Sequence, residues 1–452
     1  MDQITAAIAD YASALRFESL DAATIEAATG RLVDAVGCAL GAFDCEPAKI
    51  GRRLAAGQSP GKYAGRTLCF ADRLPAEAAT FINTTMIRNF DFNDRYPGGH
   101  PSDCLGALLA LAGASRVEGR QFLTSMTVVY EVFARLSDAA RLSRRGWDQG
   151  HAVGIATAAG VCNLLGLPAD RTAHAVGIAA ASIVPLRVTR SGELTPWKNT
   201  ATAFAAKNGL FAALLAAEGM AGPGHAFAGR DGVFDKITGP FELAPFPPDG
   251  GAALTPRVQL KYWPVETNAQ PVIWAALELR KQVRAADLAE IEVLTSKFTW
   301  FEIGSEPEKW DPRTPETADH SLPYIFARAL VDGPITVASF RAEAVLDPAL
   351  RPLMSRIRVT VDDAIEALLP QVALAVRATA RDGTSHLVEV GNPLGHPSNP
   401  MRDGDIAAKF LALGTPAIGR GRCEAALAGW RDVRSAVDIA GLMALVDLES
   451  AG

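Results

Sequence analysis

The sequence predicts a mainly α protein with an α+β part: a large all-helical domain formed by both ends of the chain, and a smaller α+β lid domain inserted between them. The first observation is length, because 452 residues are too many for one ordinary core and favour two domains. The second is that apolar residues recur at helical spacing through the first half and again near the C-terminus. The third is a middle region of short strand patterns that follows a Pro/Gly-rich stretch.

The first half is strongly helical in pattern. Its Ala and Leu residues recur at the spacing of one helix face, and the abundance of Ala and Gly predicts closely packed helices. Ser102 and Asp103 stand directly before the apolar run that begins at Leu105, and both are residue types that cap helix N-termini. The predicted helices cover residues 3–16, 21–43, 75–88, 102–115, 119–138, 150–166, 168–182 and 198–219.

The pattern changes after the Pro/Gly-rich residues 240–257. Strands are predicted at 288–297, 357–361, 371–380 and 385–390, with helices at 321–332 and 347–356. The last two strands are joined by Arg381-Asp382-Gly383, a D-G turn typical of a β-hairpin. Helical pattern returns at 405–413, 419–430 and 435–448. We therefore assign residues 1–256 to the first part of the helical domain, 257–396 to the lid, and 397–452 to the return.

The charge balance disfavours nucleic acid and membranes as partners. The net charge is −6, from 44 basic and 50 acidic residues, without the clustered positive charge that nucleic acids or anionic lipids require. The start Met1-Asp2-Gln3-Ile4 lacks the features of a signal peptide. The most apolar stretch, 152–167, is too short and too rich in Ala and Gly for a membrane span. We expect a soluble, cytoplasmic protein.

The cysteines predict neither disulfides nor metal. They are scattered and form no C-x-x-C pair, which disfavours zinc and iron–sulfur sites, although three distant cysteines can still converge in space. Reduced, buried thiols are the simpler interpretation. The six are Cys38, Cys45, Cys69, Cys104, Cys162 and Cys423.

The most unusual segment is 88–103, which reads RNFDFNDRYPGGHPSD. It gathers three carboxylates, two arginines, a histidine and a tyrosine in a Pro/Gly-rich loop between two apolar helices. Loops this rich in titratable groups often form functional sites, and His100 lies close to a helix N-terminus, which favours anions. A solvated loop of turns and caps is the alternative, and composition alone leaves both interpretations open.

Three further segments carry charge in apolar surroundings. Lys198 opens a helix made almost wholly of small residues, and Lys261 and Glu266 lie at the junction of the proposed domains, where clefts usually form. Asp148 and His151 follow an arginine-rich helix entrance. The alternative interpretation is that each lysine is a surface charge and that Glu266 caps a helix.

Tyr324 is either a buried hydroxyl or a proton donor. The sequence has no dinucleotide-binding, Walker A, zinc-protease or nucleophile-elbow motif.

Taken in chain order, these segments resemble the MmgE/PrpD family nearly end to end. Each motif is weak alone, and their order makes the resemblance specific. The motifs are Asp91-x-x-Asp94 with His100-Pro-Ser-Asp, Gly146-Trp-Asp leading to the helix that ends near Leu167, Trp197-Lys198 with Ala206-Lys-Asn-Gly, Gly229-Arg-Asp-Gly, Lys261-Tyr-Trp-Pro, His320-Ser-Leu-Pro-Tyr324, and Gly395-His-Pro-x-Asn-Pro-Met401.

The resemblance implies a helical domain with a lid, assembled as a homodimer, that acts without metal or nucleotide on a small polycarboxylate. The known chemistries of the family are dehydration of 2-methylcitrate, decarboxylation of cis-aconitate and epimerisation of iminodisuccinate. All three occur at carbon next to a carboxylate. Such a site needs cations to hold the carboxylates and an acid/base group to move a proton.

The resemblance also implies roles for individual residues. Asp91 and His100 would form the acid/base pair, one of them removing the α-proton, and Tyr324 or Asp94 would assist departure of hydroxide as water. Lys198 and Lys261 would bind substrate carboxylates. The wider set of expected substrate-binding residues is completed by Arg88, Ser102, Asp148, His151 and Glu266.

Three departures from the family pattern bear on the substrate. Asp148 stands where many members have histidine, and Glu266 stands where decarboxylase-like members have histidine. The Pro-x-Glu pattern is closer to the 2-methylcitrate dehydratases, although Asn268 replaces a histidine typical of those. We therefore expect a hydro-lyase of a hydroxylated di- or tricarboxylate. An epimerase using the same site is the alternative, and a decarboxylase or a non-catalytic carboxylate-binding protein is less favoured.

Overall fold

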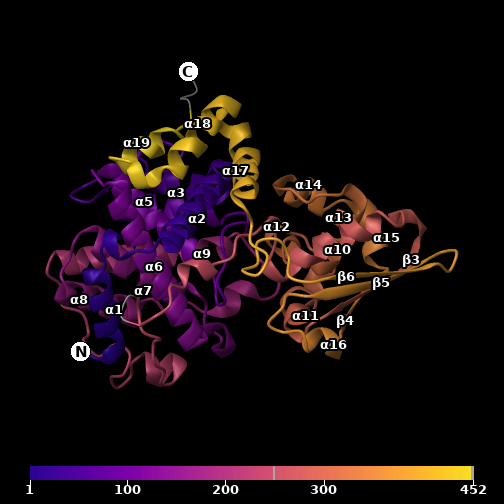
Figure 1. The fold of residues 1–452 in the computed structure, drawn as a ribbon, viewed down its shortest axis with the longest axis horizontal. Helices are drawn as coiled ribbons and strands as arrows, with labels where there is room; N and C mark the ends of the chain where they lie inside the picture. Colours follow the sequence, from indigo (N-terminus) through magenta and orange to yellow (C-terminus); the bar gives the residue numbers. More distant parts are fainter. Residues whose placement is uncertain (248–249, 449–452) are drawn as a thin grey trace.

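The computed structural model describes residues 1–247 and 250–448 and has two lobes of unequal size (Figure 1). Both chain termini lie in the larger, helical lobe, and the smaller lobe contains a four-stranded sheet. The predicted fold class, mainly helical with an α+β part, is confirmed. Residues 248–249 of the Pro/Gly-rich stretch and 449–452 of the predicted C-terminal return lie outside the described residues.

The larger lobe is a helical bundle built mostly as the periodicity predicts. A small antiparallel pair, β1 (Ala64–Arg66) with β2 (Arg73–Pro75), lies beside it. The helices before the lid are α1 (Gln3–Ala14), α2 (Ala22–Gly41), α3 (Glu46–Ala55), α4 (Ala76–Arg88), α5 (Leu105–Ala114), α6 (Gly119–Ala140), α7 (Gly150–Leu164), α8 (Ala169–Ser182) and α9 (Trp197–Ala217).

Small residues let the central helices approach closely, as expected from the composition. A Cβ atom added to Gly209 of α9 would lie 2.3 Å from the carbonyl oxygen of Gly154 in α7, so these helices meet backbone to backbone. A Cβ at Gly160 would lie 2.3 Å from a methyl group of Val129 in α6. The helices α6, α7 and α9 therefore pack closely together in this core. Lys198 lies at the start of α9.

One described helix, α9, is long and apolar enough to cross a membrane, but 67% of its apolar window is buried inside the protein. It packs against α4, α7 and α8. Its composition is thus explained by helix packing.

The C-terminal helices return to the larger lobe and join its core (Figure 1). They are α17 (Asp403–Ile418), α18 (Arg420–Arg431) and α19 (Ile439–Ala444), and α17 packs along α2. The Lys409 ammonium of α17 makes an ion pair of 2.7 Å with Asp34 and donates to the carbonyl oxygens of Phe92 at 2.6 Å and Lys261 at 3.0 Å. One buried cation therefore ties both chain ends to the segment where the lid begins.

The smaller lobe has its own hydrophobic core, separate from that of the larger lobe. Its sheet has the order β4-β3-β5-β6, with β3 and β4 parallel and the other neighbours antiparallel. The elements are α10 (Gln270–Arg280), β3 (Leu288–Thr295), α11 (Lys297–Ile303), α12 (Pro315–Ala318), α13 (Leu322–Asp332), α14 (Ala342–Val345), α15 (Arg351–Met354), β4 (Ile357–Val361), α16 (Asp363–Glu366), β5 (Leu374–Ala380) and β6 (Ser385–Val390).

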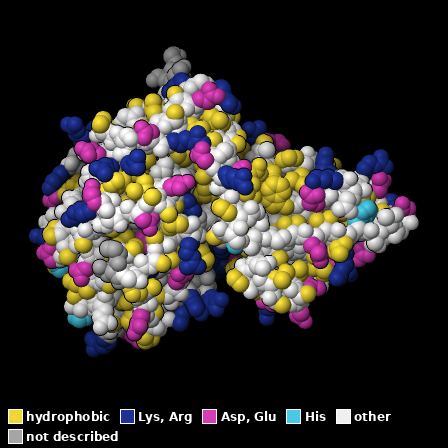
Figure 2. All heavy atoms as spheres, viewed as in Figure 1, with side chains coloured by type: hydrophobic (Ala, Val, Ile, Leu, Met, Phe, Trp, Pro, Cys, Tyr) yellow, Lys and Arg dark blue, Asp and Glu magenta, His cyan; other side chains and the backbone are white. Residues whose placement is uncertain are grey.

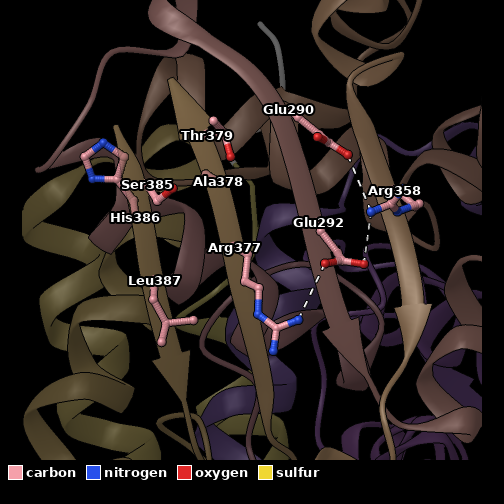
Figure 3. Close-up of a pocket in the computed structure, with 9 residues that line it drawn as sticks. All are labelled: Glu290, Glu292, Arg358, Arg377, Ala378, Thr379, Ser385, His386 and Leu387. Carbon is pink, nitrogen blue, oxygen red and sulfur yellow. Dashed lines mark hydrogen bonds and ion pairs between the residues drawn. The ribbon is translucent and has the colours of Figure 1, made fainter. Parts of the chain in front are cut away.

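One face of this sheet is open, and it carries a hollow of about 370 Å³ (Figure 3). Side chains alternate along each strand, so Glu290 and Glu292 point outward while Ile291 between them points into the core. Arg358 pairs with Glu290 at 3.4 Å and with Glu292 at 3.2 Å, and Arg377 reaches Glu292 at 3.7 Å. These exposed charges neutralise one another across the strands, which is the ordinary state of a solvated sheet face.

Candidate active site

Most residues of the loop between α4 and α5 are buried, unlike those of a solvated loop of turns and caps. Asp91, Asp94 and His100 are each no more than 7% exposed. Asp91 has a left-handed backbone, with φ of 47°. A Cβ atom at Gly99 would lie 1.6 Å from Oε1 of Gln149, and this same oxygen accepts the backbone N–H of His100 at 2.6 Å. Glycine at 99 thus lets Gln149 fix the position of His100.

Asp91 lies at the centre of a cluster of cations drawn from both lobes. Its carboxylate contacts Arg88 at 2.5 Å, Lys198 at 3.0 Å and Lys261 at 2.5 Å. The Lys261 ammonium also donates to the Asp91 carbonyl oxygen at 2.7 Å. These cations come from α4, α9 and the start of the lid segment, so Asp91 is the point at which they converge.

The charges in this cluster set the protonation states. Burial alone would raise the pKa of Asp91, but the charges of Arg88, Lys198 and Lys261 together outweigh it and hold that pKa well below the usual range. Burial also lowers the pKa of Lys261 to about 8, since the attraction of Asp91 only partly opposes it. Asp91 is therefore a stable anion at neutral pH, and Lys261 holds a proton that it releases close to neutrality.

The hydrogen bond of His100 defines which ring nitrogen is free. Nδ1 lies 2.6 Å from the carbonyl oxygen of Asp94, which only accepts, so Nδ1 carries the hydrogen and Nε2 has the lone pair. Nε2 lies 3.6 Å from an Asp91 carboxylate oxygen. Burial, with the charges of Arg88 and Lys261, holds the pKa of His100 well below its ordinary value. The ring is neutral, and Nε2 is available as a base.

A second imidazole, His320, faces Asp91 from the lid. Its Nδ1 is in contact with Asp319, and its Nε2 lies 3.6 Å from the other carboxylate oxygen of Asp91. Burial and the charge of Lys198 hold its pKa well below the ordinary histidine value. Asp319 lies 3.4 Å from Lys198, and burial raises the pKa of this carboxyl to about 6. Sequence reasoning placed neither residue in the site, although the adjacent Asp-His pair before the Ser321 helix cap was a visible signal.

A pocket of about 110 Å³ opens onto this cluster between the lobes. Figure 2 shows the hollow there, with Lys and Arg side chains along the edge of the larger lobe. Five basic side chains line the pocket against three carboxylates, although the whole chain carries a net charge of −6. The lining residues are Arg88, Asp91, Arg95, Gly98, Gly99, His100, Ser143, Gln149, Arg187, Arg190, Lys261, Glu266, Thr267, Phe298, Glu302 and His320.

The structure brings together only part of the predicted set. Arg88, Asp91, His100, Lys261 and Glu266 line the pocket. Lys198 is wholly buried beside it and contacts Asp91. The remaining predicted residues, Asp94, Ser102, Asp148, His151 and Tyr324, do not line it.

Asp94 and Ser102 hold the loop and do not face the pocket. The Ser102 hydroxyl donates to the Asp94 carboxylate at 2.6 Å, and the other oxygen of Asp94 accepts from Tyr130 at 2.6 Å. Ser102 therefore does not cap the following helix as predicted, because its side chain turns back to Asp94. The Asp94 carbonyl oxygen orients His100, and the expected role of Asp94 in the departure of water stays a prediction.

Tyr324 and His151 are also absent from the lining of the pocket. The Tyr324 hydroxyl donates to the carbonyl oxygen of Ser339 at 2.5 Å, and its ring is part of the lid core. Nδ1 of His151 lies 2.6 Å from the carbonyl oxygen of Ile183 in the helical lobe, and the residue is 3% exposed. The proton-donor role of Tyr324 and the substrate-binding role of His151 therefore stay predictions that this geometry does not support.

Glu266 combines both interpretations that the sequence left open. Its carboxylate accepts the backbone N–H of Asn268 at 2.5 Å, so it caps the short 3-10 turn Thr267–Ala269. It also lines the pocket, and burial raises its pKa.

Asp91, Asp319 and His320 could hold a metal ion, since one ligand atom from each lies within 4.8 Å of the others. The Lys198 ammonium already lies among them, 3.0 Å from Asp91 and 3.4 Å from Asp319. A metal ion would have to displace this buried cation, so these residues fit an ammonium better than a metal ion.

Comparison with known proteins agrees with this architecture. Residues 6–245 match the model of the MmgE/PrpD N-terminal domain, and residues 263–429 match that of the MmgE/PrpD C-terminal domain. The chain is 28% identical over 431 residues to a 2-methylcitrate dehydratase of Cupriavidus necator, covering 87% of this chain and 86% of the relative. A 2-methylcitrate dehydratase of Escherichia coli strain K12 is 29% identical over 345 residues, 71% of each protein.

A mouse cis-aconitate decarboxylase is 25% identical over 374 residues, which cover 78% of this chain and 74% of the relative. A lyase-type enzyme is therefore the class that the fold, the buried acid/base cluster and the relatives define together. Because the two family models cover most of its length, the chain belongs to the MmgE/PrpD family.

Proposed function

We propose that the protein is a hydro-lyase that removes water from a small hydroxylated di- or tricarboxylate, such as 2-methylcitrate. The observation that carries this proposal is the free Nε2 of His100, which faces a pocket lined by Arg88 and Lys261. A neutral base among fixed cations is suited to removing a proton from carbon next to a carboxylate, because the cations stabilise the negative charge that develops there.

The proposed reaction uses one base and one acid. His100 Nε2 takes the proton from the α-carbon while Arg88 and Lys198 supply positive charge beside the substrate carboxylate. The carbon–oxygen bond of the neighbouring hydroxyl breaks, and Lys261 gives the leaving oxygen a proton, so that water departs and an alkene forms. The lysine regains its proton from solvent, and His100 returns its proton there. A lysine with a pKa of about 8 is well matched to this acid role near neutral pH.

This assignment divides the roles of Asp91 and His100. Asp91 is held by three cations, which makes it a poor base, and its charge is needed to keep Lys198 and Lys261 in place. His100 is the better base because its Nε2 makes no such ion pair. Asp91 is thus proposed to organise the site, and His100 to move the proton.

An epimerase is the second candidate, and the position of His320 favours it. The two free imidazole nitrogens lie on different oxygens of Asp91, each at 3.6 Å, so two bases face one small pocket. Such a pair suits removal of a proton on one side of a carbon and its return on the other. In a hydro-lyase His320 has no required proton transfer, so His320→Gln is expected to retain dehydration and to abolish epimerisation.

The test is a substrate panel of 2-methylcitrate, citrate, cis-aconitate and iminodisuccinate. Formation of an alkene, followed by absorbance in the far ultraviolet, identifies a dehydratase, and chiral chromatography of the recovered substrate identifies an epimerase. Release of carbon dioxide from cis-aconitate would contradict both assignments and identify a decarboxylase. Binding of these acids with no turnover of any would contradict enzymatic function and favour a carboxylate-binding protein.

We also propose that the enzyme works in the cytoplasm.

A further inference from the structure

We infer that Arg190, positioned by Asp148, binds a second carboxylate of the substrate and selects for polycarboxylates over shorter acids. This inference rests on the proposed function, because it names a further substrate group that the same pocket recognises. Arg190 follows α8 in the short 3-10 turn Arg187–Arg190, and the sequence did not single it out. It lines the same pocket as Arg88, His100 and Lys261.

Arg190 is held firmly on one side. Its Nε donates to the Asp148 carboxylate at 2.5 Å, and Asp148 is wholly buried. The other oxygen of Asp148 accepts the backbone N–H of Gly150 at 3.0 Å at the start of α7. An anchored carboxylate that engages only Nε fixes the plane of the guanidinium and leaves its Nη atoms to face elsewhere.

The free side of the guanidinium is what points to a ligand. Nη2 of Arg190 is buried and has no hydrogen-bond partner among the described residues, and its side chain is only 12% exposed. Buried donors are normally satisfied, so an unpartnered one on a residue that lines a pocket indicates an acceptor supplied by something that binds there. Burial alone would lower the pKa of Arg190, but Asp148, and more weakly Asp91, raise it, which places this guanidinium within the field of the central cluster.

Asp148 and Arg190 therefore explain one departure from the family pattern. Where many members carry histidine, this chain carries a carboxylate, and the structure shows that carboxylate holding an arginine. The neighbouring Arg187 is paired with Glu302 of the lid at 2.6 Å, so among the described residues Arg190 is the arginine of this turn with a buried nitrogen that has no partner. Arg190 is thus the specificity-determining residue, and Asp148 is its positioning residue.

The experiment measures equilibrium binding of tricarballylate, an unreactive tricarboxylate, and of succinate by calorimetry. The wild-type protein is expected to bind tricarballylate more tightly, and Arg190→Gln to weaken tricarballylate binding by about 10- to 100-fold with little effect on succinate. Arg190→Lys keeps the charge but not the planar guanidinium, and its affinity for tricarballylate is expected to lie between those of the wild type and Arg190→Gln. The matched control is Arg144→Gln, which removes an exposed arginine nearby and is expected to bind like wild type.

An equal loss of affinity for both ligands in Arg190→Gln, or no loss of affinity for either, would overturn the inference. Failure of the wild-type protein to bind tricarballylate would also overturn it. The outcome is distinguishable from failure of the proposed function. If the subsite is right and the reaction is wrong, tricarballylate binding depends on Arg190 while no panel substrate turns over. If the reaction is right and the subsite is wrong, turnover persists in Arg190→Gln with an unchanged KM. The predicted kinetic signature is a raised KM with kcat nearly retained.

Discussion

The chemistry at the scale of single residues depends on which groups hold protons in a buried cluster. Burial lowers the pKa of both His100 and Lys261, but the consequences for the proposed reaction differ. In the proposed reaction the neutral histidine is the base, and the lysine is an acid with a pKa of about 8. The Asp91 anion opposes the loss of the Lys261 proton and holds Lys198 and Lys261 in place.

The pH dependence of kcat/KM should report the state of Lys261. The acid role requires its protonated form, and the protonated fraction falls as pH rises through about 8. We therefore expect kcat/KM to fall about tenfold per pH unit above that value. In Lys261→Arg the group stays charged, so a slower enzyme without this alkaline decline is expected. A wild-type profile that is flat to pH 10 would remove Lys261 from the acid role.

At the scale of elements, the site depends on the loop between α4 and α5. The residue types of this loop predicted a site, but its burial and its internal bonds could not be inferred from composition. Ser102 and Asp94 bond to each other, and Gln149 from another segment holds His100. The contact with Gln149 spans 49 residues of sequence, and local pattern contains no information about it.

The substitution Gly99→Ala tests this support. Its methyl group would overlap Gln149, so the His100 loop must shift, at a cost of about 1–3 kcal/mol in the free energy of unfolding. We expect activity to fall at least tenfold, because the base loses its fixed position. The measurements are chemical denaturation and steady-state kinetics, with Gly404→Ala as the control, since its methyl group would meet nothing within 4 Å. Wild-type kinetics in Gly99→Ala would show that the Gln149 contact does not position His100.

At the scale of the whole molecule, the periodicity of the sequence predicted most helices of the larger lobe and all four strands of the lid sheet. It missed α3, whose ten residues are too charged for an apolar window, and α10, which begins at Gln270-Pro271. The site was harder to predict than the fold, because Asp91 contacts Lys198 and Lys261 across 107 and 170 residues of sequence. The family resemblance identified these lysines. It did not identify Arg190, Asp319 or His320, whose relevance follows only from the packing of one lobe on the other.

The homodimer implied by the resemblance remains a prediction, and α9 offers a surface for it. Trp197, Phe204 and Phe211 are 50%, 45% and 47% exposed and are spaced seven residues apart, which forms one apolar stripe. Such a stripe suits a second copy of the same helix across a twofold axis. Light scattering should give twice the chain mass of 47.7 kDa for the wild type and for the exposed-site control Leu54→Glu. Phe204→Glu with Phe211→Glu should give the single-chain mass, and an unchanged dimer would place the interface elsewhere.

The central claim is that His100 Nε2 removes the proton next to a substrate carboxylate in the pocket between the lobes. The most direct measurement is deuterium incorporation from D2O into recovered substrate, followed by mass spectrometry for the wild type, His100→Gln and Arg144→Gln. The account predicts label next to the carboxylate with the wild type and the control, and a rate at least ~100-fold lower in a folded His100→Gln. Exchange in folded His100→Gln within a few fold of wild type would contradict it.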